Sequence, residues 1–243
     1  MQRYEIKLYL TIINKKFGLV NFLSHYYFER YSLHSERILG ALLPDLLKNV
    51  DKRYNFHPQR FEEVLFAHPK TMWISEGWYR HVEVDRLFHT SDFFLDHTHA
   101  LRRRLDPVVA HLPVRASFLA HIALELLLDH LLIDHTLVNP NRLYEHLGHV
   151  QKVTIEKYLQ AIGEVDTERF SVFFERFVTS RYILDYADIS NLSYALFNIC
   201  KRVWTFESTG DDRDKLTACL RVYKEEHLVN YMYIFHEIQS KLP

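Results

Sequence analysis

The chain of 243 residues is 48% hydrophobic and 25% charged, with six glycines and seven prolines. This composition excludes an intrinsically disordered chain and predicts a folded globular protein with one large core. A formal net charge of -1 excludes a global field that would attract nucleic acid or an anionic membrane, so we expect neither as a partner. Two cysteines, Cys200 and Cys219, argue against a disulfide framework and favour a reducing compartment, the cytoplasm.

The first twenty residues differ in character from the rest of the chain. The apolar stretch from Leu8 to Ile13 is too short to span a bilayer, and no small-residue cleavage site follows it. We therefore expect neither a membrane anchor nor a secretory signal. The β-branched content of this segment favours a short strand or a loose tail.

From Asn21 onward, apolar residues recur at three- and four-residue spacing, which is typical of amphipathic helices. Period-two alternation is scarce, and no internal repeat or long linker divides the chain. We therefore predict an all-α, single-domain bundle of many helices over residues 21–243. The expected helix starts, each marked by a capping residue or a proline, are Ser35, Pro58 and Thr167. Pro44 should kink its helix or end it near Leu43.

Histidines are distributed unevenly along the chain. Of the sixteen histidines, only His227 and His236 lie beyond residue 149. Imidazole groups titrate near neutral pH and are common metal ligands. Any metal or acid–base chemistry is therefore expected in the front part of the sequence.

The segment "HIALELLLDHLLIDH" combines core leucines with charged side chains. On a helix with about 100° per residue, His121, Glu125 and Asp129 fall within an arc of about 80°. Leucines cover most of the remaining helix surface, so we expect the helix to be enclosed on several sides. A buried carboxylate without a partner is costly and would take up a proton. The stripe therefore predicts a bound cation.

A second stripe lies in "RHVEVDRLFHTSDFF", where His81, Asp85, His89 and Asp92 also share an arc of about 80°. Residues four apart rise by about 6 Å and can meet at one ion, whereas residues eight apart rise by about 12 Å and cannot easily do so. Each helix is therefore expected to supply one close pair, and the other members would serve a second ion, the substrate or the support of a ligand. Mixed imidazole and carboxylate ligands favour manganese, iron or zinc over calcium.

Acids and histidines at helical spacing are also common on solvated faces, and either stripe alone would be open to that interpretation. The two stripes together favour a metal site. The segment "DHTHALRRRLD" is interpreted as surface. The same interpretation applies to four other histidines, His57, His68, His146 and His149.

Four short motifs occur in order along the chain: "NFLSH" at 21–25, "GALLPDL" at 40–46, "HVEVD" at 81–85 and "ELLLDH" at 125–130. Together they resemble the ordered motifs of the acyl carrier protein phosphodiesterases, a family grouped with the HD-type metal-dependent phosphohydrolases. The resemblance covers about residues 21–135. It implies an HD-like all-α fold and hydrolysis of the phosphodiester that joins 4'-phosphopantetheine to a serine of acyl carrier protein, within fatty acid metabolism. The implied cofactor is a divalent metal, commonly manganese, with iron or zinc as alternatives.

The resemblance also assigns residues to the site by motif position. The positions that would line it are His25, Asp45, His81, Asp85, Glu125, Asp129 and His130. As metal ligands we expect His81, Asp85, Asp129 and Asp45, with His89 and His121 as further candidates. His130 or His25 would give a proton to the leaving serine oxygen, and Glu125 would orient the water or complete the coordination. Glu125 and His89 both stand where the family has Asp, and the second change removes a negative charge.

Family members tend to begin at the Asn-Phe-Leu motif, and Val20 stands where their initiator Met would be. Residues 1–20 are therefore interpreted as an extension from a misassigned start, with a valine start codon at Val20 as the hypothesis. Acyl carrier proteins are acidic, and docking of one would need a basic rim. The first candidates for that rim are Arg102, Arg103 and Arg104, and the next are Lys48, Lys52 and Arg53. Both runs are equally compatible with ordinary solvated surface.

Two other functions stay open. One is a metallohydrolase acting on another phosphate ester, and the other is a protein that binds the carrier protein without turnover. Fold-level analogy alone does not separate them. The aromatic C-terminal part could cover the site, form the interface of a homo-oligomer or enlarge the core.

Overall fold

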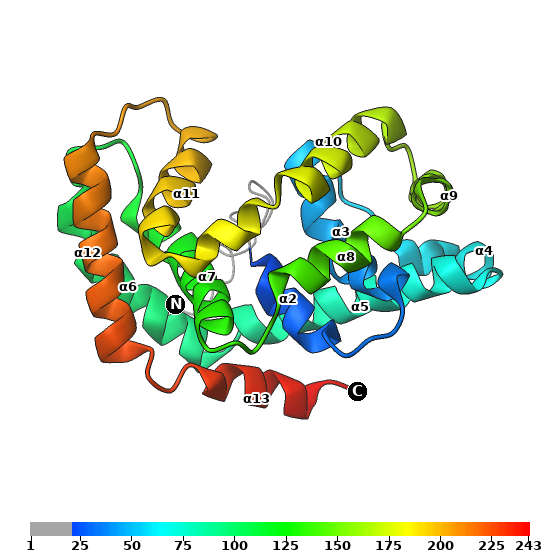
Figure 1. Ribbon diagram of the computed structural model, residues 1–243, viewed down its shortest axis with the longest axis horizontal. Coiled ribbons are helices and arrows are strands. Elements are labelled where there is room, and N and C mark those ends of the chain that lie inside the picture. The colour runs from blue at the N-terminus through cyan, green and yellow to red at the C-terminus, as the bar shows by residue number, and fades with distance from the viewer. Residues whose placement is uncertain (1–20) are drawn as a thin grey trace, which may run out of the picture. The chain divides into compact units, whose positions relative to one another are not determined.

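The computed structural model describes residues 21–243, and every regular element in that range is a helix (Figure 1). The expectation of an all-α fold is confirmed, whereas the HD-like arrangement stays a prediction. The expectations for residues 1–20, which concern the strand or tail and the start near Val20, lie outside the described residues. The described chain forms two compact units, residues 21–82 with 138–182 and residues 83–137 with 183–243.

The first unit contains α2 (Phe22–Glu29), α3 (Ser35–Val50), the 3-10 helix η1 (Pro58–Phe61), α4 (Glu62–Phe66), the first two-thirds of α5 (Pro69–His89), α8 (Pro140–His149), α9 (Lys152–Ile162) and α10 (Thr167–Ser180). Helix α3 packs against α2, α8 and α10, as Figure 1 also indicates. Its central leucines are fully buried, so α3 forms the middle of this unit's core.

Two glycines let α3 and α5 approach each other at backbone distance. A Cβ atom at Gly40 would fall inside contact distance of the Ile74 carbonyl oxygen and 2.9 Å from its carbonyl carbon. A Cβ atom at Gly77 would lie 2.8 Å from the backbone nitrogen of Ala41. Real carbon contacts are about 3.5–4.0 Å, so only glycine fits at either position. This close crossing brings the following turns of both helices together.

Helix α3 continues through Pro44 and ends at Val50, so the alternative of an end near Leu43 is wrong. Pro44 has no amide hydrogen and therefore leaves the carbonyl of Gly40 without its intrahelical donor. Burial of nearly every apolar residue of α3 outweighs the lost hydrogen bond, because each such side chain contributes about 1.5–3 kcal/mol.

A buried carboxylate ties α2 to the rest of the first unit. Glu29, at the end of α2, is 4% exposed. It accepts a hydrogen bond of 2.7 Å from Arg37 of α3, and Arg80 of α5 lies 3.5 Å away. Two guanidinium groups offset the cost of burying this charge and fix the end of α2.

The expected helix starts match the structure, because α3, η1 and α10 begin at Ser35, Pro58 and Thr167. The capping group of α10 is the preceding residue, Asp166, whose carboxylate accepts from the Arg169 amide at 2.9 Å.

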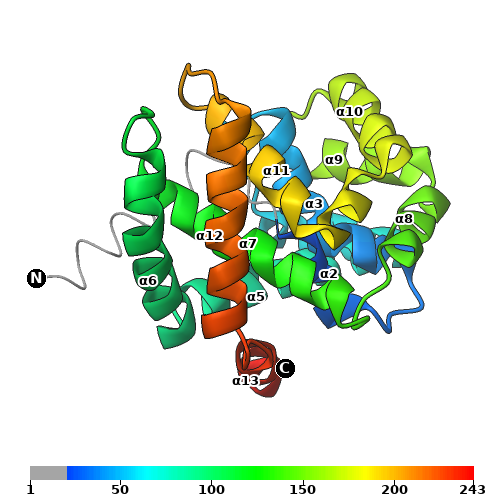
Figure 2. The same cartoon turned by 60° about the vertical axis from the view of Figure 1, so that its left-hand side comes forward.

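The second unit contains the end of α5, α6 (Asp92–Val109), α7 (Ala116–Asp134), the 3-10 helix η2 (Tyr182–Ala187), α11 (Ile189–Lys201), α12 (Gly210–His227) and α13 (Met232–Lys241). Helix α7 packs against α6, α11 and α12, and Figure 2 shows α12 running beside α6. By length and composition α7 could cross a membrane, but 89% of its apolar window is buried inside the protein. Its hydropathy is therefore that of a core helix.

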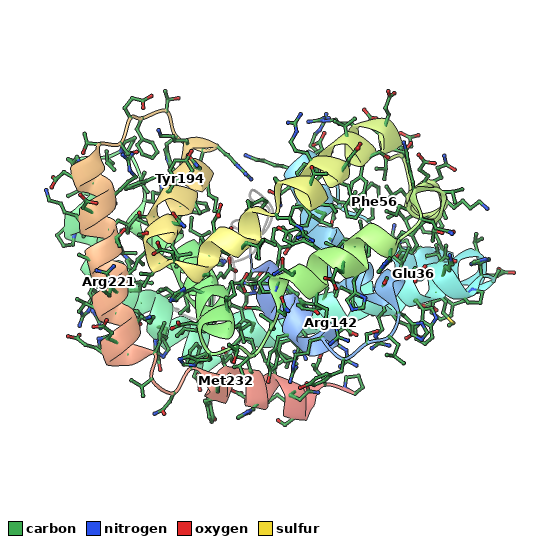
Figure 3. All side chains as sticks on the ribbon, in the orientation of Figure 1. Glu36, Phe56, Arg142, Tyr194, Arg221 and Met232 are labelled. Atoms are coloured by element: carbon green, nitrogen blue, oxygen red, sulfur yellow. The ribbon has the colours of Figure 1, made fainter. Side chains whose placement is uncertain are left out.

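The aromatic C-terminal part enlarges the cores of both units. Phe170 and Phe177 are buried in the first unit, and Tyr223 and Tyr231 are buried in the second. Figure 3 shows how densely the side chains surround the helices. Of the three roles considered for this part, packing within the core is the one these contacts support.

Candidate metal sites

Three side chains from separate motifs meet in the first unit. His25 comes from α2, Asp45 from α3 and His81 from α5, and each is less than 5% exposed. One donor atom from each lies within 4.8 Å of the others. We call this group the histidine–aspartate cluster.

The glycine crossing orients the His81 ring within this cluster. Nδ1 of His81 lies 2.8 Å from the carbonyl oxygen of Ala41. A carbonyl oxygen can only accept, so Nδ1 carries the proton and a neutral ring presents the lone pair of Nε2. This Nε2 lies 3.8 Å from Oδ1 of Asp45, and the His25 ring stacks on the His81 ring with centroids 3.9 Å apart.

The histidine–aspartate cluster has the donor chemistry of a divalent transition-metal site and could hold a metal. Two ligands at about 2.1 Å from one ion and about 109° apart are separated by about 3.4 Å. The 3.8 Å between Nε2 of His81 and Oδ1 of Asp45 is larger than this. Binding would therefore draw the side chains together by a few tenths of an ångström.

A second group lies in the second unit. His89 comes from the last turn of α5, and His121 and Glu125 are four residues apart on α7. The two Nε2 atoms are 3.3 Å apart, and Oε1 of Glu125 lies 3.2 Å from Nε2 of His121 and 3.3 Å from Nε2 of His89. We call this group, which could also hold a metal, the histidine–glutamate cluster.

Neighbouring groups fix the rings of the histidine–glutamate cluster. Nδ1 of His89 donates to the Asp85 carbonyl at 2.9 Å, with Oδ1 of the same residue 3.1 Å away. This leaves Nε2 as the atom that faces His121 and Glu125. The Phe94 ring packs edge-on against both imidazoles, with centroids 4.7 Å and 4.9 Å away.

The charges in the histidine–glutamate cluster are strongly coupled. Burial disfavours the protonated His89 ring, but the carboxylates of Asp85 and Glu125 outweigh it and hold the pKa of His89 well above its ordinary value. Burial also opposes ionisation of Glu125, but His121 and His89 together lower its pKa. Neither oxygen of Glu125 accepts a hydrogen bond of good geometry from the described residues. The carboxylate is thus a buried anion that needs positive charge beside it.

Several predicted site residues lie in positions that do not fit the roles expected for them. Glu125 and His25, expected as catalysts, lie among the potential metal donors. The expected close pair on α7 is present as His121 and Glu125, and Asp85 supports His89. Asp129 is fully buried but belongs to neither cluster.

Asp92 does not extend the stripe on α5. The helix ends at His89, and Asp92 is an exposed residue in the first turn of α6. The hydroxyl of Ser91 accepts from the Phe94 amide at 3.1 Å, so this serine caps a new helix and breaks the periodicity.

His130 has surroundings that the front part of the sequence did not predict. Its Nδ1 donates to the Tyr186 carbonyl at 2.8 Å, and its Nε2 lies 3.3 Å from Nζ of Lys224. Burial lowers the pKa of His130; the hydrogen bond to Tyr186 opposes this, and the Lys224 ammonium adds to the lowering. Lys224 was missed because it lies in the charged run "RVYKEEH" of α12, beyond the stretch that carries the motifs.

The predicted basic rim is only partly open. Arg102 and Arg103 are exposed, whereas Arg104 is paired with Glu226 at 2.6 Å. In the alternative run, Arg53 is paired with Asp51 at 2.7 Å. Of the histidines interpreted as surface residues, His57, His68 and His149 are exposed. His146 is half-buried, and its Nδ1 forms a hydrogen bond of 3.0 Å with Ser35.

No family model, curated protein or solved structure matches the chain. The resemblance to the acyl carrier protein phosphodiesterases therefore stays a prediction from its four motifs.

Proposed function

We propose that this chain is a metal-dependent phosphodiesterase that releases 4'-phosphopantetheine from holo-acyl carrier protein. One observation carries the proposal. Three of the four motifs that suggested the family, separated by up to 56 residues in the chain, each contribute one side chain to the histidine–aspartate cluster. All three side chains are buried, and two imidazoles with a carboxylate form a common donor set for a divalent metal.

His25, Asp45 and His81 would hold the divalent ion; the resemblance implies manganese, and mixed nitrogen and oxygen donors are equally compatible with iron or zinc. When bound, such an ion lowers the pKa of a water molecule and neutralises charge on phosphoryl oxygens. The chain's contribution is to keep the donors in place. The Ala41 carbonyl holds the proton of His81 on Nδ1, so that Nε2 stays available as a ligand.

The leaving serine oxygen needs a proton, and the resemblance implies His130 as its donor. Nε2 of His130 lies 3.3 Å from the Lys224 ammonium and can accept from it. Burial lowers the pKa of His130, and the Lys224 ammonium adds to the lowering. Arg102 and Arg103 are the exposed cations that we assign to the acidic face of the carrier protein.

A gel-shift assay for conversion of holo- to apo-acyl carrier protein, with added manganese, tests the proposal. The wild type should convert the carrier protein, and Asp45→Asn should lose nearly all of this activity. Glu63→Gln, which changes an exposed carboxylate of α4, is the matched control and should retain it.

Bound manganese without conversion would contradict the substrate and point to another phosphate ester. Tight binding of the carrier protein without release would instead favour a non-catalytic binding protein. Equal activity of Asp45→Asn and wild type would exclude the histidine–aspartate cluster as the active metal site.

A further inference from the structure

We infer that the histidine–glutamate cluster is a second, separate metal site that takes a four-coordinate divalent ion of the zinc type and stabilises the second unit. This inference does not depend on the proposed phosphodiesterase activity. It concerns His89, His121 and Glu125, all of which belong to the second unit.

The distances between donor atoms carry the inference. The three donors form a nearly equilateral triangle with sides of 3.2, 3.3 and 3.3 Å. Ligands at about 2.1 Å from one ion lie about 3.4 Å apart in tetrahedral geometry and about 3.0 Å apart in octahedral geometry. The triangle is closer to the tetrahedral value, so an ion fits it without rearrangement of the side chains.

The donor set and geometry together select the type of ion. Two imidazoles and one carboxylate form a recurrent zinc ligand set with one further position for water. Calcium and magnesium prefer sites made of oxygen, and manganese favours octahedral coordination by oxygen-rich ligands. A nearly tetrahedral site with two nitrogen donors therefore favours zinc over these ions.

The residues around the three ligands hold the ligand side chains in place, as is common around metal sites. The Asp85 carbonyl and carboxylate hold Nδ1 of His89, an arrangement that commonly orients metal-bound histidines. The edge of Phe94 packs against both imidazole rings and limits their rotation. His89, His121 and Glu125 are each less than 5% exposed, so solvent offers little competition for the ligands.

A cluster of charged side chains without metal is the competing explanation. It accounts for the attraction between His89 and Glu125 and, with one ring donating to the other, for the 3.3 Å between the two Nε2 atoms. It leaves both oxygens of the fully buried Glu125 carboxylate without a well-formed hydrogen bond. One ion satisfies all three groups together. It would also join the end of α5 to α7, so its binding adds directly to the stability of the second unit.

The test uses the full chain after treatment with a chelator. Zinc should bind and raise the thermal unfolding midpoint, and cobalt at the same site should give the intense visible absorption of tetrahedral coordination. We expect His121→Gln to weaken zinc binding by more than about 100-fold, because loss of a ligand costs more than the 10–100-fold that is typical for a supporting residue such as Asp85. His99→Gln, an exposed histidine of α6 in the same unit, is the matched control and should bind as the wild type does.

Asp45→Asn should keep the cobalt signal, so loss of the proposed phosphodiesterase centre and loss of this site give different results. If His121→Gln does not fold, X-ray absorption of zinc bound to Asp45→Asn decides: two imidazole nitrogens and one carboxylate oxygen would support the inference. Absence of tetrahedral cobalt absorption in the wild type, or unchanged zinc affinity in a folded His121→Gln variant, would overturn it.

Discussion

Gly40→Ala tests whether the crossing of α3 and α5 builds the histidine–aspartate cluster. The new Cβ atom would lie 2.9 Å from the Ile74 carbonyl carbon, so the helices must separate by about 1 Å to reach an ordinary carbon contact. The same shift would lengthen the 2.8 Å bond from His81 to the Ala41 carbonyl to about 3.8 Å, which is beyond hydrogen-bonding range.

The expected cost of Gly40→Ala is the sum of two effects. Overpacking costs about 1–3 kcal/mol, and a buried polar group that loses its partner costs about 1–3 kcal/mol more. For a chain of this length, a loss of about 2–6 kcal/mol lowers the thermal midpoint by about 4–24 °C. Manganese affinity should fall as well, because His81 would lose the contact that orients its ring.

Thermal unfolding and manganese titration measure both effects. Gly148→Ala is the matched control, since a Cβ atom at this helical glycine of α8 would meet nothing within 4 Å. It should be neutral or stabilise the protein by about 0.4–1 kcal/mol. If Gly40→Ala were as stable as Gly148→Ala and bound manganese as the wild type does, the reasoning about the crossing would be refuted.

Three further predictions follow from other contacts. Gly163→Ala should lower the free energy of unfolding, measured in urea, by about 1–3 kcal/mol. The reason is that φ is 150° at Gly163 and that a Cβ atom would lie 2.8 Å from the ring of Phe56, which Figure 3 labels. Unchanged stability would contradict this. Burial, with repulsion from His227, lowers the pKa of His97, so the unfolded chain binds the proton more readily and stability should rise with pH up to about 6.5. Urea midpoints between pH 5 and 7 for His97→Gln should show a smaller slope than the wild type, and an equal slope would be the opposing result. Replacing both Arg102 and Arg103 by Glu should raise the KM for holo-acyl carrier protein about tenfold with little change in kcat, and a KM that stays constant would exclude them from docking.

The sequence was informative where the signal is local. The pairing of His121 with Glu125 follows from helical periodicity, because residues four apart meet on one face. The argument that residues eight apart cannot share an ion is also consistent with the structure, since His81 and His89 belong to different clusters. The all-α fold followed from the same periodicity.

Tertiary contacts decided what the sequence could not predict. Which histidine joins which acid depends on helix crossings, and Gly40 was recognised only as part of a motif, without its role in the approach of α3 to α5. The surroundings of His130 depend on Lys224, which lies 94 residues further along the chain. The end of the stripe at His89 depends on the cap formed by Ser91, whose signal is weaker than the apolar pattern around it.

The central claim is that the histidine–aspartate cluster holds the ion that the phosphodiesterase reaction needs. The most direct test measures the rate of 4'-phosphopantetheine release against free manganese for the wild type and for His25→Gln. The account predicts release by the wild type that a chelator abolishes, and for His25→Gln a half-saturating manganese concentration at least about tenfold higher. Release that persists in the chelator, or the same manganese dependence in both proteins, would contradict it.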